Sequence, residues 1–482
     1  MRDIVAIHID NKTLTDSLGR VSNPTNISEL LDFLMINQPN TYILCWNLYR
    51  IIELIKHLIP NSAYMELLSK DKVWVDGYKL FSSSGKKLSI GHEYRTQLHD
   101  NFYESRKQEV DIYNLYKYFP DYQPKNANDI VTKGKELLTT LETMGIYNPK
   151  TLASGIAMYA DHIMSNQLIP HLYDCPEEAL EMADYALEMM NREWRATYKI
   201  GRFPYATQID VNGCYPSIVK DFGDLANATY WYSNKYEHCD FGLFKGTVTI
   251  TGDTPIIDSD KQPKIGTYTD IITTEDWAYL NHFKKGHFEP TAGWMLKYNN
   301  NYKPCEQIMI DLYKQRNQGG LVSDLSKSFS VGLIGQFSQY YEEKKGKFYN
   351  PIYSVMATSR ASLKVGVMLE MKGLWNNLVY ANVDGVIVDK QIKLGDNRRS
   401  LGDFRSEEVD ALILSMSHKY IGEQMNGMLM AIKKYPKATS YNDIVLSPEM
   451  NITNRVFNEY PRNGNDWINN IYNSEAMKVT NE

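Results

Sequence analysis

Two aspartates stand where apolar, strand-like stretches of the sequence end. Asp210 closes "YATQID", whose alternation of apolar and polar residues is typical of a half-buried strand. Asn212-Gly213 then breaks this strand, and Pro216 suits the first turn of a following helix. The sequence therefore predicts a strand, a turn and a helix, with the Asp210 carboxylate at the strand end, where it can face a ligand.

The second acid, Asp384, lies between two β-favouring runs, "LVY" at 378–380 and "VIV" at 386–388. Asp-Gly is a common hairpin turn, so the turn alone is enough to explain Asp384. Two carboxylates at neighbouring strand ends can also hold two Mg²⁺ ions roughly 3.5–4 Å apart. Such a pair orients an in-line attack on phosphorus and neutralises the developing charge. Asp210 and Asp384 together thus predict phosphoryl or nucleotidyl transfer.

A helical pair between the two acids carries cations and glycines. Arg316 ends "EQIMIDLYKQRN", and Lys327 lies on "LVSDLSKSFSVGLIGQF" after a glycine pair. Both cations could grip a triphosphate, the arginine in bidentate fashion. Gly332 and Gly335 lie three residues apart, hence on one helix face. They leave room for a flat group to approach closely or for another helix to pack, and the sequence leaves both readings open.

The elements that must position these residues alternate along the chain. Short strand-like runs occur up to about residue 120, and the pattern is helical from about 126 to 198. Strands and turns return at 203–300. Residues 357–375 read as a buried helix and residues 376–390 as a hairpin, after which we expect a helical C-terminal region.

Composition bounds the class of protein. A chain of 482 residues is expected to form two to four domains. Its 43% hydrophobic and 23% charged residues are typical of a soluble globular protein, and no apolar run could span a bilayer. The N-terminus lacks a signal-peptide pattern, and five scattered cysteines without a CxxC favour a reducing, cytoplasmic setting without structural zinc.

The charge balance argues against nucleic-acid binding through overall charge, because the formal net charge is −6. A negative net charge is still compatible with nucleic-acid binding through a local basic channel around an acidic centre. Basic runs occur at 344–348 ("KKGKF") and 433–437 ("KKYPK"), and solvated surface charge explains each of them more simply. Some of the 35 tyrosines could stack on bases.

Three stretches, in order, resemble the polymerase motifs of family-B DNA polymerases. "DVNGCYPSIV" resembles D-x-x-S-L-Y-P-S-I-I, "KSFSVGLIGQF" resembles K-x-x-x-N-S-x-Y-G-K-F, and "YANVDGVIV" resembles Y-x-D-T-D-S. The stretches "LGDFRSEEVDALILSMSHKYIG" and "MNGMLMAIKK" look similar to the region after the third motif in protein-primed phage and linear-plasmid polymerases. The resemblance is good over 203–222 and 305–435 and weak before them.

The resemblance implies an α+β, right-hand architecture of palm, fingers and thumb, with an N-terminal exonuclease-like α/β domain of RNase H-like type. Its parts are expected at 1–195 (exonuclease-like), 196–223 (palm, first motif), 224–300 (insertion of protein-primed type), 301–340 (fingers, second motif), 341–400 (palm, third motif) and 401–482 (thumb).

The resemblance also implies site residues. Asp210 and Asp384 would bind two Mg²⁺ ions, for which Mn²⁺ can substitute, and the Val211 carbonyl would help to hold the nucleotide-bound ion. Tyr215 would lie under the incoming sugar and exclude a ribose 2′-hydroxyl, which favours deoxynucleotides.

Further residues would bind the triphosphate and the DNA. Lys327, with Arg316 as a helper, would bind the triphosphate. Gly332 and Ile334 would lie against the nascent base pair, and Gly335 on the same helix would also face DNA. Lys419 and Tyr420 resemble the K-x-Y motif that grips primer DNA. The implied partners are primer-template DNA, deoxynucleoside triphosphates and a terminal priming protein, with no membrane, in the cytoplasm of a bacterial host if a phage encodes the chain.

The sequence departs from the family pattern at several positions. Asn382 replaces the first acid of the third motif, and an amide cannot supply its charge. Val383 and Gly385 replace Thr and Ser. In the second motif the substituted positions are Val331, Gly332, Ile334 and Gln336. We expect activity with weaker metal affinity, and fidelity and template grip are in doubt.

The region of the family's proofreading exonuclease has few of the acids that it needs. His8 stands where the first acid is expected and Ile51 where a later one is, which leaves Asp10 and Asp129. We therefore expect little or no 3′–5′ proofreading.

Residues 224–300 occupy the place of the insertion that docks a priming protein. Only about forty residues separate the second and third motifs, so we expect modest processivity and weak strand displacement.

Three functions remain open from the sequence. The preferred one is a DNA-directed DNA polymerase without proofreading. A non-catalytic family-B descendant that binds DNA or a replication partner is the alternative, motivated by Asn382 and the depleted exonuclease acids. Primer synthesis or untemplated extension would use the same metal site.

Overall fold

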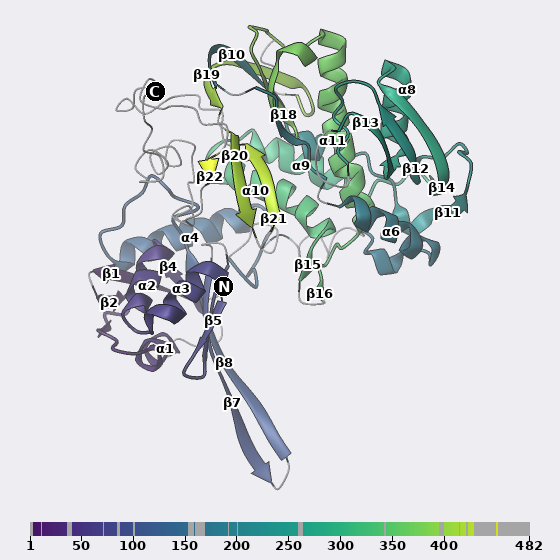
Figure 1. Cartoon of the computed structure of the whole chain (residues 1–482). Coiled ribbons are helices and arrows are strands. Elements are labelled where there is room, and N and C mark those ends of the chain that lie inside the picture. The colour runs from purple at the N-terminus through teal and green to yellow at the C-terminus, as the bar shows by residue number, and fades with distance from the viewer. Residues whose placement is uncertain are drawn as a thin grey trace. The chain divides into compact units, whose positions relative to one another are not determined.

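Two units make up this computed structural model (Figure 1). The first comprises Met1–Asn166 with Gln315–Phe329, and the second comprises Gln167–Lys314 with Ser330–Glu482. The structure describes residues 3–10, 12–35, 41–70, 72–83, 87–99, 102–152, 159, 169–190, 192–199, 201–258, 264–341, 344–394, 400–413, 415–420, 423–428 and 450–451.

The first unit is built on an eight-stranded sheet in the order β3-β2-β1-β4-β8-β7-β6-β5. β1 runs parallel to β4 and β4 parallel to β8, whereas the other neighbours are antiparallel. The strands are β1 (Asp3–Asp10), β2 (Thr13–Asp16), β3 (Val21–Ser22), β4 (Thr41–Cys45), β5 (Lys72–Val75), β6 (Tyr78–Ser83), β7 (Lys87–His99) and β8 (Phe102–Asn114). β7 and β8 form the long hairpin visible in Figure 1.

The helices that the structure describes beside this sheet include α1 (Ile27–Met35), α2 (Leu48–Lys56), α3 (Asn61–Lys70) and α4 (Ala127–Thr143). α4 packs on β1 and β4, and a Cβ at its Gly134 would lie only 2.4 Å from Leu44 Cδ1. The glycine therefore sets how closely this helix approaches the sheet. Apolar side chains from both sheet and helices, such as Ile43 and Ile51, form one core.

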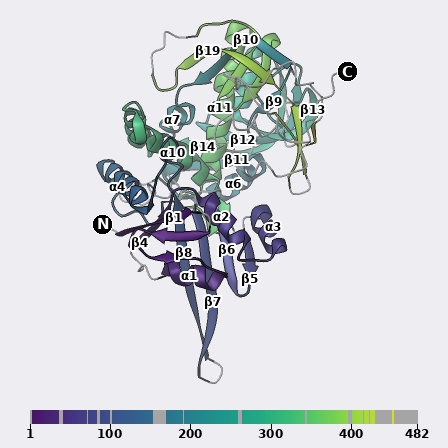
Figure 2. The ribbon, with the colours of Figure 1, turned by 90° about the vertical axis from the view of Figure 1, so that its left-hand side faces the viewer.

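The second unit contains a five-stranded antiparallel sheet in the order β19-β10-β18-β17-β9. Its strands are β9 (Arg195–Thr197), β10 (Gly201–Val211), β17 (Leu378–Asn382), β18 (Gly385–Val388) and β19 (Phe404–Ile413). β10 and β19 lie side by side in both ribbon views (Figures 1 and 2). Ala206, Val379, Ile387 and Val409 form an apolar cluster on this sheet.

The long helix α11 (Pro351–Lys372) lies at the centre of the second unit, and every residue from 351 to 357 is buried. Its neighbours include α6 (Glu178–Met189), α7 (Cys214–Val219) and α8 (Thr274–Phe283). A helix that is buried on several faces needs such cover on several sides. The predicted buried helix at 357–375 is thus confirmed, with earlier bounds.

A second sheet of this unit has the order β11-β14-β12-β13, and α8 packs on it. The strands are β11 (Ala228–Ser233), β12 (Phe241–Ile250), β13 (Gly266–Thr273) and β14 (Gly286–Tyr298). It fills most of the predicted insertion 224–300, and α8 joins it to α11 through polar contacts.

These contacts, here called the α8–α11 clasp, join the two helices through three side-chain pairs. Arg360 Nη2 lies 2.7 Å from Glu275 Oε1. Ser359 donates to Asp276 Oδ1 at 3.1 Å. Further along, the Tyr279 hydroxyl donates to Glu370 Oε1 at 3.0 Å.

The remaining described elements include a helical pair and short strands. Gly319 and Gly320 separate α9 (Glu306–Arg316) from α10 (Gly320–Phe337) with φ values of +80° and +60°, which suit glycine. The short elements are η1 (Leu172–Asp174), η2 (Leu225–Asn227), η3 (Trp375–Asn377), β15 (Tyr340–Tyr341), β16 (Lys344–Lys345), β20 (Ser415–Tyr420), β21 (Glu423–Met428) and β22 (Met450–Asn451). No helix in the described part of the chain is long and apolar enough to cross a membrane.

Two sequence-based expectations differ from the structure. Residues 167–195, expected in the exonuclease-like part, group with the second unit, in which α6 packs on α11 and β13. The region after 400, expected to be helical, forms strands in its described part, and β19 pairs with β10. Residues 404–413 of the predicted thumb therefore belong to the five-stranded sheet.

Candidate active site

Asp210 stands at the end of β10, as the sequence predicted. Its side chain is 24% exposed, and the next turn reverses the chain into α7, with Pro216 in the first turn. Gly213 has φ +58°, and a Cβ there would lie 2.8 Å from Leu401 Cδ1. The Asn212 side chain donates to the Tyr313 hydroxyl of α9 at 2.6 Å. This turn is therefore fixed by a glycine conformation and by packing on α9.

Asp384 lies in the turn of the predicted hairpin, which the structure confirms as β17 and β18 with Asn382 opposite Gly385. The preceding residue, Val383, has φ +55°, a region that β-branched residues rarely adopt. Val383 is buried and its N–H donates to the Trp194 carbonyl at 2.7 Å. Packing and this bond hold the turn in a strained conformation beside the candidate acid.

The structure brings the two acids together on neighbouring strands. Asp210 is directly opposite Gly385 in the β10–β18 pairing, and the Val211 N–H donates to the Asp384 carbonyl at 3.0 Å. A Cβ on Gly385 would lie 2.4 Å from Asp210 Oδ1. The Asp210 carboxylate thus uses the space that the missing side chain leaves, and the predicted juxtaposition of the two acids is confirmed.

Two donors to Asp210 were not foreseen from the sequence. Arg405 is directly opposite Asp210 in the β10–β19 pairing, and its Nη2 lies 3.1 Å from Asp210 Oδ2. Gln208 Nε2 donates to the same oxygen at 2.9 Å. The only sequence signal for Arg405 is a cation in the stretch "LGDFRSEE", and its pairing depends on a strand that the sequence did not predict.

Tyr215 lies in the first turn of α7, close to these acids. Burial raises the pKa of its hydroxyl, and the carboxylates of Glu193 and Asp384 raise it further. Burial and then Asp384 raise the pKa of the adjacent Cys214 thiol to about 12. Both side chains stay neutral at ordinary pH, so α7 presents a neutral aromatic ring and a neutral thiol near Asp384.

Asn382, at the position of the missing acid, is exposed and lies opposite Arg195 of β9. Arg195 forms an ion pair with Glu193. Among the residues that the structure describes, no group of three or more His, Cys, Asp or Glu side chains could hold a metal. The acidic set at this site is therefore the pair Asp210 and Asp384, whose carboxylate oxygens are ligands that Mg²⁺ prefers.

The predicted nucleotide-binding residues lie on the helical pair. Arg316 is the last residue of α9 and Lys327 is an exposed residue of α10. Both fall in the segment 315–329, which groups with the first unit, so their convergence on Asp210 and Asp384 stays a prediction.

The second half of α10 carries the predicted DNA contacts. Gly335 is exposed and a Cβ on it would meet nothing within 4 Å, which leaves the approach of a flat group open. Gly332 is half-buried, and Ile334 is only 8% exposed. A contact of Ile334 with a base pair therefore has no support from its exposure. Lys419 and Tyr420 end β20, and their side chains lie outside the described residues.

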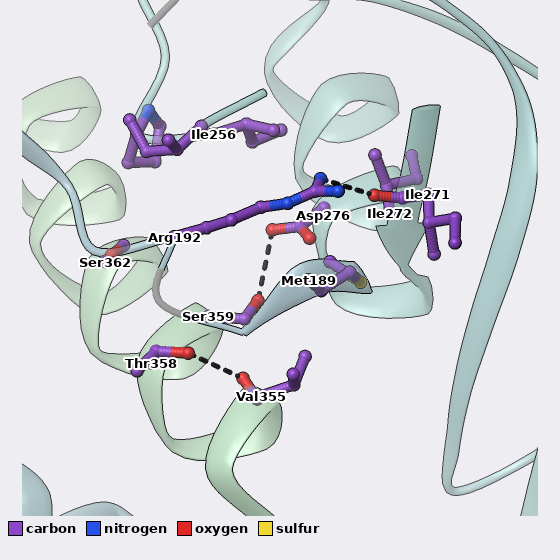
Figure 3. Close-up of a pocket in the computed structure, with 12 residues that line it drawn as sticks. Met189, Arg192, Ile256, Ile271, Ile272, Asp276, Val355, Thr358, Ser359 and Ser362 are labelled. Atoms are coloured by element: carbon purple, nitrogen blue, oxygen red, sulfur yellow. Dashed lines mark hydrogen bonds between the residues drawn. The ribbon is translucent and has the colours of Figure 1, made fainter. Parts of the chain in front are cut away.

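A small cavity elsewhere in the second unit is lined by residues of α6, β13, α8 and α11 (Figure 3). Its volume of about 30 Å³ suits one or two water molecules, so it is too small for a nucleotide. Arg192 forms a buried ion pair with Asp270 at 2.9 Å. Burial raises the pKa of the Asp276 carboxyl to about 6. These groups hold the clasp region together and do not form the candidate active site.

The acids expected in a degenerate exonuclease lie in the first unit. Asp10 is the exposed last residue of β1, where His8 is half-buried. Asp129 lies in the first turn of α4, and its Oδ2 accepts from the Lys125 N–H at 2.7 Å, so this carboxylate closes a helix end. Ile51, at the position of a missing acid, is 1% exposed in the core.

No known family profile and no curated protein matches this sequence. Several solved structures, however, match the fold of this chain. Phi29 DNA polymerase with primer-template DNA aligns at 13% identity and a TM-score of 0.58, over 89% of this chain and 90% of that one. Its ternary complex with primer-template DNA and incoming nucleotides aligns at 13% identity and a TM-score of 0.57, over 89% of each chain. Its complex with single-stranded DNA gives 12% identity and a TM-score of 0.55, over 89% and 90%. The predicted resemblance to a protein-primed, family-B polymerase is confirmed at the level of the fold.

Proposed function

We propose that this chain is a template-directed DNA polymerase that adds deoxynucleotides to a 3′-hydroxyl by two-metal nucleotidyl transfer. The observation that carries the proposal is the meeting of Asp210 and Asp384 on neighbouring strands, with Tyr215 next to them. The fold shared with phi29 DNA polymerase supports it. Solved relatives that contain primer-template DNA favour the same partner here.

The donor set fits a pair of magnesium ions. Asp210 and Asp384 would hold both ions, and the Val211 carbonyl would add a neutral oxygen to the one that carries the nucleotide. Magnesium held by these residues would supply a lower pKa for the primer hydroxyl and positive charge against the phosphates. Asn382 can donate or accept a hydrogen bond but adds no charge, which keeps the affinity for metal low.

Other residues of the chain would select and orient the substrate. The neutral Tyr215 ring, held by α7, would close the space beside a sugar 2′-carbon and so exclude ribonucleotides. Lys327 and Arg316 would bind the triphosphate and the departing pyrophosphate. Gly335 leaves the surface of α10 open to a flat base pair. Lys419 and Tyr420 would grip the primer strand.

The domains would have the roles of palm, fingers and thumb in a right-hand polymerase architecture. The five-stranded sheet is the palm, α9 and α10 are the fingers, and strands after β19 belong to the thumb. The sheet β11–β14 with α8 is the insertion on which a terminal priming protein would dock, as expected for replication of a phage or mobile element.

The first unit would serve as a scaffold or single-strand guide without proofreading. Its strands β1, β4 and β8, parallel to one another, support the RNase H-like assignment. Asp129 is committed to the helix end, and Ile51 is in the core. Asp10 alone cannot hold two metals.

A non-catalytic descendant is the second candidate. Asn382 and the Arg405 guanidinium on Asp210 favour it, because both reduce the negative charge available to a metal. The retained pair of acids and Tyr215 argue for catalysis.

Extension of a labelled primer on a template, with Mg²⁺ and four deoxynucleotides, tests the proposal. We expect extension by the native chain and a loss on the order of 10³-fold or more in Asp210→Asn and Asp384→Asn. Asp32→Asn makes the same chemical change at an exposed position of α1 and should leave extension intact. No extension with Mg²⁺ or Mn²⁺ would favour the non-catalytic role.

Two further reactions in the same assay distinguish untemplated synthesis, primer synthesis and exonuclease activity. Extension without template or without primer would indicate untemplated synthesis or primer synthesis. Primer shortening in the absence of nucleotides would show that the first unit retains exonuclease activity.

A further inference from the structure

Arg405 is a cation bonded to a candidate metal-binding carboxylate, that of Asp210. Its Nη2 lies 3.1 Å from Asp210 Oδ2. That oxygen also accepts from Gln208, so two donors already occupy it. A metal ion at Asp210 needs the lone pairs of this carboxylate and meets a positive charge beside it. Arg405 therefore bears directly on how the site takes up metal.

The main chain fixes where Arg405 stands. β19 pairs with β10, and Asp210 has Arg405 directly opposite. Just before β19, the Asn212 N–H donates to the Asp403 carbonyl at 2.8 Å and the Gly402 N–H donates to the Asn212 carbonyl at 2.7 Å. These reciprocal bonds lock the register two residues from Arg405. The sheet thus fixes the Arg405 backbone directly opposite Asp210, within reach of its guanidinium.

The pair is nevertheless easy to open. The Arg405 side chain is 62% exposed, against 24% for Asp210. Exposed ion pairs contribute little to stability, because water solvates both partners well when they separate. The guanidinium can swing into solvent while β19 stays in place. A divalent cation, with twice the charge, can then take its position.

We propose that Arg405 is a positioning residue, a tethered cation that holds the Asp210 carboxylate in the metal-free protein and competes with the metal for it. The inference rests on the proposed metal-binding function of Asp210. Because the guanidinium cancels one of only two negative charges, the site binds a divalent cation weakly by itself. A nucleoside triphosphate brings its own negative charges, so the metal enters mainly together with the nucleotide.

The direct test measures Mn²⁺ binding to the full chain without nucleotide or DNA, from the electron paramagnetic resonance signal of free Mn²⁺. A guanidinium about 5 Å from a divalent ion, in water and screened about twofold by salt, lowers the affinity about fourfold. We therefore expect Arg405→Gln to bind Mn²⁺ about fourfold more tightly than the native chain. Arg405→Lys keeps the charge and should keep the weak affinity.

Two controls complete the test. Lys372→Gln removes one charge at an exposed position in the last turn of α11 and should leave the affinity unchanged. Asp210→Asn combined with Arg405→Gln should lose the tight binding, which assigns it to this carboxylate. Equal affinities of the native chain and Arg405→Gln would overturn the proposal, and so would no detectable binding by either protein at millimolar Mn²⁺.

The result is separable from that of the primer-extension test. Tighter Mn²⁺ binding by Arg405→Gln supports the tethered cation even if the chain extends no primer. Conversely, a chain that extends primers while Arg405→Gln leaves Mn²⁺ binding unchanged keeps the polymerase function and loses this inference.

Discussion

Replacement of Gly385 by alanine should disturb the site mainly through its contact with Asp210. The new Cβ would lie 2.4 Å from Asp210 Oδ1, whereas ordinary contacts begin near 3.4 Å. The carboxylate must therefore retreat by about 1 Å. The Cβ would also lie 3.2 Å from the Ile209 carbonyl oxygen, a tight contact that a backbone shift of a few tenths of an ångström relieves, and no positive φ restricts Gly385.

The expected effect is on catalysis and not on folding. A displacement of about 1 Å in a group that orients the reaction costs on the order of 10²-fold in rate. We expect the single-turnover rate of nucleotide incorporation by Gly385→Ala, at saturating nucleotide, to fall by about that factor. The free energy of unfolding should change by less than about 1 kcal/mol, since a flexible carboxylate absorbs the contact.

Gly252→Ala is the matched control, because its Cβ would meet Lys285 Cδ at an ordinary 3.7 Å. A native incorporation rate in Gly385→Ala would show that Asp210 has a second, equally productive orientation. That outcome would refute the argument that the missing side chain sets the position of the carboxylate.

Three further predictions concern other parts of the second unit. Tyr215→Ala should accept ribonucleotides, reducing the preference for deoxynucleotides in single-nucleotide incorporation about 10²-fold, since the ring that closes the space beside the sugar is lost. Burial raises the pKa of the Asp276 carboxyl from 3.8 to about 6, so its ionisation disfavours the folded state. The stabilising contribution of the Asp276 carboxyl is complete below pH 3.8 and is lost as the pH rises through about 6. Relative to the native chain, the free energy of unfolding of Asp276→Asn in urea should therefore rise by on the order of 3 kcal/mol between pH 4 and pH 7. Arg192→Met removes the cation that pairs with the buried Asp270 carboxylate, since the two side chains are 8% and 5% exposed. It should lower the free energy of unfolding by about 3–5 kcal/mol, and a loss below about 1 kcal/mol would contradict this.

The strand, turn and helix around Asp210 could be predicted because their signals are local. Alternating apolar residues mark β10, Asn212-Gly213 marks the turn, and Pro216 suits the first turn of α7. The hairpin at Asp384 has the same kind of signal in its Asp-Gly pair. Local rules therefore placed both acids at strand ends.

The pairing between distant segments could not be predicted in the same way. Arg405 is 195 residues from Asp210, and "EEVDALIL" does not show that it pairs with β10. Likewise α6 continues a helical pattern in the sequence, yet its partner α11 comes more than 160 residues later. Domain membership and the donors to Asp210 depend on these long-range contacts, which periodicity does not encode.

The α8–α11 clasp bears on how such chains can diversify. An insertion joined to its host by two short linkers could be exchanged between relatives as a cassette. Here Glu275, Asp276 and Tyr279 supply partners to Ser359, Arg360 and Glu370 of a central helix. A chimaera that replaces residues 224–300 would leave those three polar groups facing a foreign surface. The sheet β11–β14 with α8 and the helix α11 must therefore change together during evolution, and a graft of residues 224–300 must bring its own side chains of the clasp.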